Sequence, residues 1–354
     1  MNSASTKLLK SVLSALHYTG LGSLVAPLTR GRGVIFTLHQ VHPETRKGFD
    51  PNGILRVTPE FLEQVILQVR GLGFDLVDLD EAVDRITAAE PSARPFASFT
   101  FDDGYRDNLI HAYPVMQRHG VPFTIYVPSD FPDGGGELWW LALEDVLRRS
   151  NEVTVQLMGA VRTFPCATTA EKQAAFETIY WWLRGLPEDR ARQVIRELAA
   201  GAGVDLAQQC RDLIMTWDEV RTLARDPRVT IGAHTRRHFA ISNLPADEAR
   251  QEIADSMARI EAEIGRPCRH FSFPYGDETS ATQRDFDIAA SLGLASAVTT
   301  RKGLIHAAPR HCLTGLPRVS LNGDYQRSRY VEVLLTGAPF ALWDMLRRSQ
   351  PAAS

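Results

Sequence analysis

The sequence has few cysteines and no strong excess of either charge. Its 354 residues include only four cysteines, and no two of them form a Cys-x-x-Cys pair. Their spacing argues against a thiolate metal site and a disulfide framework, and it favours reduced thiols in the cytoplasm. The formal net charge of -3 does not indicate a nucleic-acid-binding protein. A neutral or mildly cationic substrate is compatible with this charge. The four cysteines are Cys166, Cys210, Cys268 and Cys312.

The N-terminal stretch also lacks the features of a convincing signal peptide or a membrane span. Lys7 and Lys10 precede a moderately apolar segment, but polar residues interrupt it and no small-residue cleavage site follows. Leucines and valines recur in this stretch at helical spacing. We therefore expect residues 1–32 to form an amphipathic segment that packs on the domain. The alternative is peripheral contact with a membrane surface through residues 7–28.

Apolar strands and amphipathic helices alternate along most of the remaining chain, which is typical of parallel α/β domains. Residues 138–215 break the pattern, because they contain helical periodicity and no convincing parallel strand. We interpret them as a mostly helical insertion in a domain that spans residues 33–345. Thr58, Asp80 and Thr216 are predicted helix N-caps. Strands are predicted at 33–38, 74–79, 96–101, 123–127, 229–231, 271–273, 297–299 and 316–320.

Two adjacent carboxylates, Asp102 and Asp103, directly follow the predicted strand at 96–101. Neighbouring carboxylates repel each other unless a cation offsets them. Adjacent side chains also point in different directions, so one can bind a metal while the other faces a reacting centre. Taken alone, the segment is equally compatible with an ordinary turn after a strand.

Two histidines four residues apart, His234 and His238, follow the strand at 229–231 and a glycine. This spacing places them about one helical turn apart, where neutral imidazoles can chelate a divalent ion. Together with Asp103 they supply two nitrogens and one oxygen. Three protein ligands with open positions are typical of a catalytic metal site rather than a structural one.

A sharp turn follows the strand at 271–273, where Pro274 and Gly276 flank Tyr275. A turn of this kind can aim a backbone N–H into a site as an oxyanion donor. All three segments follow predicted strands. Active sites of parallel α/β proteins form at the carboxyl ends of the strands, so we expect the segments to meet there.

These three segments, in this order, resemble the motifs of the polysaccharide deacetylase family, carbohydrate esterase family 4, which includes chitooligosaccharide deacetylases. The resemblance implies a distorted (β/α) barrel of about seven strands that removes N-acetyl groups from a carbohydrate. It implies a divalent metal, usually zinc and sometimes cobalt or nickel, held by Asp103, His234 and His238. It also implies that Asp102 is the general base and that the backbone N–H of Tyr275 helps to hold the oxyanion.

The sequence departs from the family pattern at two points. Many members carry an arginine two residues before the proline of the third motif, where this chain has Ser272. Arg318 is our candidate for its replacement. Many members also have a late histidine as general acid, but neither His306 nor His311 follows a convincing strand. A subgroup places this histidine on the first strand, so we predict that His39 is the general acid. The alternative for His39 is a core histidine.

Three other functions fit parts of the pattern. A metal-dependent amidase acting on small amides would share every metal ligand. A glycoside hydrolase needs two carboxylates about 5 Å or more apart, which adjacent aspartates fit poorly. A carbohydrate-binding protein without activity would account for Ser272. The glycan, the metal and the oligomeric state stay open.

Four tryptophans could stack on sugars, although core packing is their default role. They are Trp139, Trp140, Trp181 and Trp182.

Overall fold

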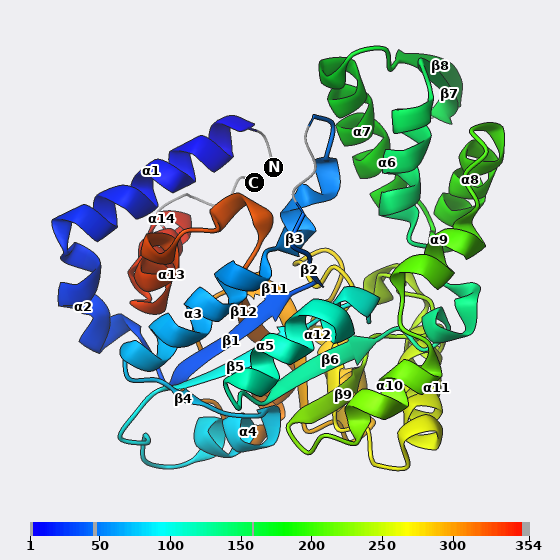
Figure 1. The fold of residues 1–354 in the computed structure, drawn as a ribbon. Coiled ribbons are helices and arrows are strands. Elements are labelled where there is room, and N and C mark those ends of the chain that lie inside the picture. Colours follow the sequence, from blue (N-terminus) through cyan, green and yellow to red (C-terminus); the bar gives the residue numbers. More distant parts are fainter. Residues whose placement is uncertain (1–2, 45–47, 158, 349–354) are drawn as a thin grey trace.

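Seven parallel strands close into a barrel at the centre of the molecule (Figure 1). The structure is a computed structural model that describes residues 3–44, 48–157 and 159–348. A short eighth strand, β4 (Asp75–Leu76), lies outside the ring beside the first residues of β5. The expected (β/α)7-type barrel is therefore present. Around the ring the strands are β1 (Gly33–Leu38), β12 (Leu316–Ser320), β11 (Ser296–Lys302), β10 (His270–Ser272), β9 (Val229–Ala233), β6 (Phe123–Val127) and β5 (Phe96–Phe101), which pairs again with β1.

The barrel strands are rich in β-branched and aromatic residues because both of their faces are covered. Every residue of β1, β5 and β6 is buried. A strand with two covered faces is apolar along most of its length instead of alternating between apolar and polar residues. The rings of Phe36 and Phe99 lie 5.1 Å apart across the β1–β5 pairing that closes the barrel.

Helices surround the barrel and mostly begin where the sequence predicts. The hydroxyl of Thr58 accepts a hydrogen bond from the N–H of Phe61, and Thr216 forms a capping box with Glu219. The prediction for Asp80 was wrong, because Asp78 caps that helix. The helices are α3 (Pro59–Gly71), α4 (Leu79–Thr87), α5 (Tyr113–Arg118), α10 (Trp217–Ala224), α11 (Ala246–Ile264), α12 (Gln283–Ser291) and α13 (Ser328–Leu335).

The predicted strand at 74–79 is shorter than expected. It is reduced to β4, which pairs with only the first two residues of β5. The remaining length of that edge of β5 is taken by β6, from Phe99 to Phe101. Beyond Leu76 the N–H of Val77 still donates a 3.1 Å hydrogen bond to the carbonyl of Ala97, and Asp78 then caps α4.

The segment between β6 and α10 builds a separate unit with its own apolar core. It contains a β-hairpin that the sequence analysis did not anticipate. In β7, exposed and buried residues alternate, since only one of its faces meets that core. Figure 1 shows this unit at the upper right of the barrel. Its elements are α6 (Trp139–Arg149), β7 (Glu152–Leu157), β8 (Ala160–Pro165), α7 (Thr169–Arg184), α8 (Glu188–Gly201) and α9 (Leu206–Leu213).

Short elements complete the connections between the larger ones. A π-helical turn at Phe131–Gly135 follows β6. A small parallel pair, β2 (Gln40–Val41) and β3 (Arg56–Val57), extends the end of β1. Other short turns of 3-10 or π helix lie at Pro51–Leu55, Asn108–Ala112, Ile241–Asn243, Arg310–Gly315 and Gly323–Tyr325.

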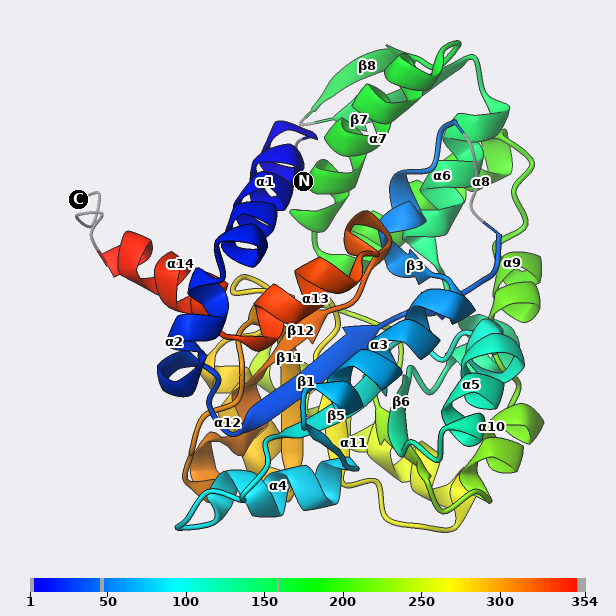
Figure 2. The same ribbon diagram turned by 60° about the vertical axis from the view of Figure 1, so that its left-hand side comes forward.

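Helices from both ends of the chain lie together on one side of the molecule (Figures 1 and 2). They are α1 (Ser3–Thr19), α2 (Leu21–Thr29) and α14 (Ala338–Arg348). On α1, Leu13 is buried against Tyr330 and Val333 of α13. Of the helices in the described part of the chain, none combines the length and apolarity needed to cross a bilayer.

We predict that Leu13→Ala loosens α1 without unfolding the barrel. Loss of a buried leucine costs about 2 kcal/mol or more, so amide exchange in α1 should rise by about thirtyfold. Hydrogen–deuterium exchange with mass spectrometry measures this directly. Leu8→Ala is the matched control, because Leu8 is 68% exposed and should leave exchange unchanged. Equal exchange in the two variants would contradict the packing of α1 through Leu13.

Candidate metal centre and active-site cleft

Asp103, His234 and His238 converge at the carboxyl end of the barrel. Asp103 follows β5, and both histidines lie in the segment that follows β9. Oδ1 of Asp103 lies 3.4 Å from Nε2 of His234 and 3.2 Å from Nε2 of His238. One ligand atom from each residue lies within 4.8 Å of the others, and all three residues are buried. The structure thus brings together the three residues that the sequence analysis selected as metal ligands.

Strained backbone aims these side chains at one another. Within the described residues, only four non-glycine residues have a positive φ: Asp103 (74°), Thr235 (60°), His238 (58°) and Tyr275 (60°). All four belong to the three sequence motifs. Left-handed backbone is costly for such residues and is concentrated at functional sites. The prediction that the histidines share a helical turn was wrong, because the segment after β9 is irregular.

The protonation states around Asp103 suit a metal ligand set. Nδ1 of His234 lies 2.6 Å from the carbonyl oxygen of Ser272, so an N–H there leaves Nε2 free to face Asp103. Burial lowers the pKa of His238 to about 4, although the neighbouring carboxylate of Asp103 opposes the shift. Burial alone would raise the pKa of Asp103, but the two imidazoles beside it hold it well below its usual range. The set therefore offers two imidazole nitrogens and one ionised carboxylate.

These residues fit a divalent metal. In the described part of the chain, Oδ1 of Asp103 is buried without a hydrogen-bond partner. A buried carboxylate oxygen without a partner is costly, and a bound cation would remove that cost. Two imidazoles and one carboxylate are also a donor set that zinc accepts in catalytic sites.

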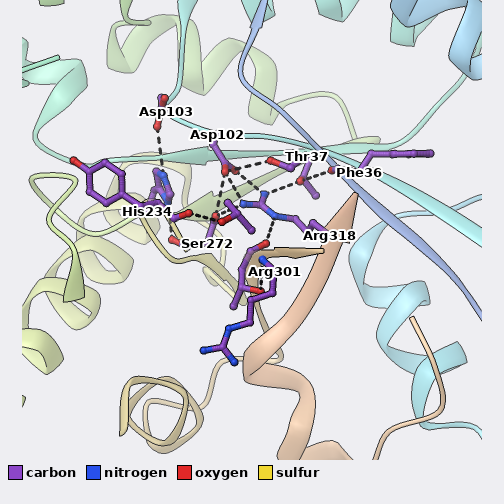
Figure 3. Close-up of polar contacts among 12 residues, drawn as sticks. Phe36, Thr37, Asp102, Asp103, His234, Ser272, Arg301 and Arg318 are labelled. Atoms are coloured by element: carbon purple, nitrogen blue, oxygen red, sulfur yellow. Dashed lines mark hydrogen bonds and ion pairs between the residues drawn. The ribbon is translucent and has the colours of Figure 1, made fainter. Parts of the chain in front are cut away.

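Asp102 points away from Asp103 and forms a buried ion pair with Arg318 of β12 (Figure 3). The guanidinium donates two hydrogen bonds, of 2.8 Å to Oδ1 and 2.6 Å to Oδ2. It also donates to the hydroxyl of Ser272, 3.0 Å away. Burial alone would raise the pKa of Asp102, but the charge and hydrogen bonds of Arg318 outweigh burial and lower it. Arg318 therefore supplies the cation that the sequence motif lacks at Ser272.

His39 and Tyr275 both face the same cleft as the three ligands. The cleft has a volume of about 780 Å³, and Asp102, His234 and His238 also line it. His39 directly follows β1 and is half-buried. It therefore borders the cleft and is not enclosed in the core.

The turn at Tyr275 is held through its carbonyl, while its backbone amide stays without an acceptor among the described residues. Its carbonyl oxygen accepts a hydrogen bond of 2.5 Å from the hydroxyl of Thr300. No group in the described residues accepts a hydrogen bond from the N–H of Tyr275. That N–H is consequently available to a bound oxyanion.

His306, one of the two late histidines, does not share the cleft with His39. His306 lies next to Gly31, which stands just before the start of β1. A Cβ atom added at Gly31 would be about 3.0 Å from Nδ1 of His306. His39 follows the other end of the same strand, so the two histidines lie at opposite ends of the barrel. The side chain of His311 lies outside the described part of the structure.

The inserted helices hold the motif loops, a role that the sequence did not reveal. Nε1 of Trp139 donates a 2.7 Å hydrogen bond to the hydroxyl of Tyr275. The guanidinium of Arg184 lies 3.5 Å from the centre of the Tyr275 ring. The ring of Trp140 lies 4.8 Å from that of His238, whose carbonyl accepts a 3.3 Å hydrogen bond from Arg192. No local motif marks these residues, because their partners are far away in the sequence.

The four tryptophans divide between core and cleft. Trp139 and Trp140 are buried, and Trp182 packs partly against the core of the inserted unit. Trp181 is 62% exposed and lines the cleft. Only Trp181 of the four therefore presents most of its surface to solvent there.

We predict that Arg318→Met lowers the free energy of unfolding by about 3–5 kcal/mol, because it leaves the buried carboxylate of Asp102 without its counter-charge. Urea unfolding at pH 7 measures the loss. The double variant Arg318→Met/Asp102→Asn should recover part of it. Arg190→Met is the control. Because Arg190 is half-exposed, this substitution should change the free energy of unfolding by no more than about 0.5 kcal/mol.

The free energy of unfolding that Arg318→Met loses should depend on pH. The pKa of Asp102 is lowered in the folded protein, so its contribution to stability is present above the ordinary aspartate pKa of about 3.9 and is lost as the pH falls further. The difference between the wild type and Arg318→Met should therefore narrow in acid. A constant difference would contradict the ion pair as its source.

Comparisons with known proteins agree with this fold. A family model described as polysaccharide deacetylase matches residues 189–297. Over 73 residues, which are 21% of this chain, the sequence is 32% identical to YxkH of Bacillus subtilis, whose name describes it as a polysaccharide deacetylase. That match spans about a quarter, 26%, of the relative's length.

Two solved structures of other proteins share the fold. The deacetylase PplD of Streptococcus pyogenes, in complex with acetate, superposes with a TM-score of 0.57 at 16% identity, over 85% of this chain and 97% of that one. IcaB of Ammonifex degensii has a TM-score of 0.53 at 17% identity, over 86% and 98% of the two chains. The chain is thus similar to polysaccharide deacetylases, in sequence over residues 189–297 and in fold over most of its length.

Proposed function

We propose that this protein hydrolyses N-acetyl groups on a carbohydrate and releases acetate, with a divalent metal bound by Asp103, His234 and His238. The observation that carries the proposal is the convergence of these three buried ligands within 4.8 Å, beside a cleft that also contains Asp102 and His39. The acetate complex of the Streptococcus pyogenes deacetylase supports acetate as the product.

Zinc is the proposed metal, with cobalt or nickel as alternatives, and when bound it would polarise the acetamide carbonyl and lower the pKa of water. Asp102 takes a proton from the attacking water. Arg318 keeps Asp102 ionised by lowering its pKa, and the two hydrogen bonds from the guanidinium fix the plane of the carboxylate. A base held in one orientation loses little entropy in the reaction.

Two further groups act on the other side of the acetamide. The backbone N–H of Tyr275 stabilises the negative charge that develops on the carbonyl oxygen, and the left-handed turn at Tyr275 fixes its direction. His39, in its protonated form, gives a proton to the departing sugar amine. Its position directly after β1 places it on the wall of the cleft.

The cleft supports a carbohydrate substrate with several sugar units, such as a chitooligosaccharide or another polymer containing N-acetylglucosamine. Its volume of about 780 Å³ is far larger than a single acetamide group requires. Trp181 on its wall offers an exposed indole face on which a sugar ring can stack. These two observations favour a glycan over a small cyclic amide.

We predict that activity requires the metal ligands. Removing divalent ions with a chelator should abolish acetate release from chitooligosaccharides, and zinc, cobalt or nickel should restore it. Asp103→Asn should bind much less zinc, as measured by elemental analysis of the purified protein. Asp102→Asn is the matched control, because it should keep zinc and lose acetate release. Full activity of the wild type in excess chelator would rule out the proposed mechanism.

We predict that His39→Ala lowers kcat by about 10²–10⁴, the usual contribution of a general acid. Zinc content should be unchanged, since His39 is not one of the three ligands. Steady-state kinetics on a chitooligosaccharide, together with zinc analysis, separates the two effects. His306→Ala should retain wild-type kcat, because His306 lies beyond the other end of β1. Near-full turnover of His39→Ala would show that another group protonates the amine.

A further inference from the structure

Exposed apolar side chains are concentrated on the three terminal helices. Of thirteen large apolar side chains that are exposed in the described residues, nine belong to α1, α2 and α14. We call these nine the terminal apolar surface. A water-exposed cluster of this kind marks an interaction site. Its members are Leu8, Tyr18, Leu21, Leu24, Leu28, Leu342, Trp343, Met345 and Leu346.

The exposed residues follow helical faces and their helices lie side by side. On α2, Leu21, Leu24 and Leu28 are spaced three and four residues apart, so they share one face. The end of α2 contacts the turn that joins α13 to α14, where the hydroxyl of Thr29 donates a 2.6 Å hydrogen bond to the carbonyl of Thr336, and α2 also contacts α14 itself. Figure 2 shows α1, α2 and α14 on the same side of the molecule.

The charge of this region is positive, although the chain as a whole carries a formal charge of -3. The first acidic residue of the sequence is Glu44, and before it stand two lysines and two arginines. Lys7 is exposed on α1 beside Leu8. Apolar residues flanked by cations, with tryptophan and tyrosine among them, are the features of helices that lie in the interface of an anionic membrane.

A second copy of the chain is the main alternative occupant. In a two-fold dimer the same surface meets itself, so the lysines of one subunit would face those of the other. In the sequence of α1, α2 and α14 the single acidic residue is Asp344, which stands against Lys7, Lys10, Arg347 and Arg348. The charge therefore favours an anionic partner over a self-contact.

We propose that the terminal apolar surface binds the surface of an anionic phospholipid bilayer, with α1, α2 and α14 lying in the interface. The inference is independent of the proposed activity, because lipid binding requires no catalysis. It does have a consequence for the cleft. Thr6, Lys7 and Lys10 of α1 line the cleft, so a bilayer bound by this surface would lie next to the substrate site.

Vesicle flotation with the full chain tests the proposal. The protein should float with phosphatidylcholine vesicles that contain phosphatidylglycerol, and much less with phosphatidylcholine alone or in high salt. The pair Leu24→Glu/Leu28→Glu and the pair Trp343→Glu/Met345→Glu should each lower the partition coefficient by at least about tenfold. Leu67→Glu/Ile110→Glu is the matched control, because both residues are 54% exposed and lie elsewhere.

Three results would overturn the proposal. The first is failure of the wild-type chain to float with the anionic vesicles. The second is equal loss of flotation in the control pair. The third is a dimer in analytical ultracentrifugation that the Leu24 and Leu28 substitutions dissociate, since it would assign the surface to a second copy. Circular dichroism and acetate release from a soluble substrate should match the wild type in every variant, so that misfolding is recognised separately.

Discussion

The buried ion pair between Asp102 and Arg318 is the constraint on which the site depends. Two charges removed from water are tolerated only when each is fully compensated. Here the guanidinium of Arg318 reaches from β12 to the carboxylate of Asp102 and donates two hydrogen bonds to it. Besides Asp102, Arg318 contacts the hydroxyls of Thr100 and Ser272 and the carbonyl of Thr299. It thus joins β5, β10, β11 and β12 at their carboxyl ends. With Asp102 held by Arg318, the adjacent Asp103 is turned to the opposite side, toward the histidines.

Barrel closure and the inserted unit then fix the remaining geometry. Closure through β1 and β5 places His39 beside the aspartates, although more than sixty residues separate them in the sequence. The left-handed residues of the motif loops store strain, which the surrounding contacts must balance. The inserted helices provide such contacts, since Trp139 and Arg184 hold Tyr275 while Trp140 and Arg192 hold His238. The inserted unit is therefore part of the support of the site as well as a wall of the cleft.

The cleft runs between two regions that lie outside the barrel itself. On one side stands α7, with Trp181, and on the other stands α1, with Lys7 and Lys10. The chemistry is located on the barrel, whereas the surroundings of the substrate are set by these added helices. Loops and additions at the carboxyl end of such barrels commonly determine what is bound, because the strands beneath them are fixed by packing.

The sequence alone determined the residues that end the strands, because a buried strand followed by polar residues is a local pattern. Asp102, Asp103, His234 and Tyr275 could be found in this way, and parallel strands share one carboxyl edge. The tertiary structure decided what depends on distant segments. It paired Arg318 with Asp102 across 216 positions and placed the inserted helices behind the motif loops. It also gave the β7–β8 hairpin its single buried face. Such contacts arise from barrel closure and packing, which no short stretch of sequence encodes.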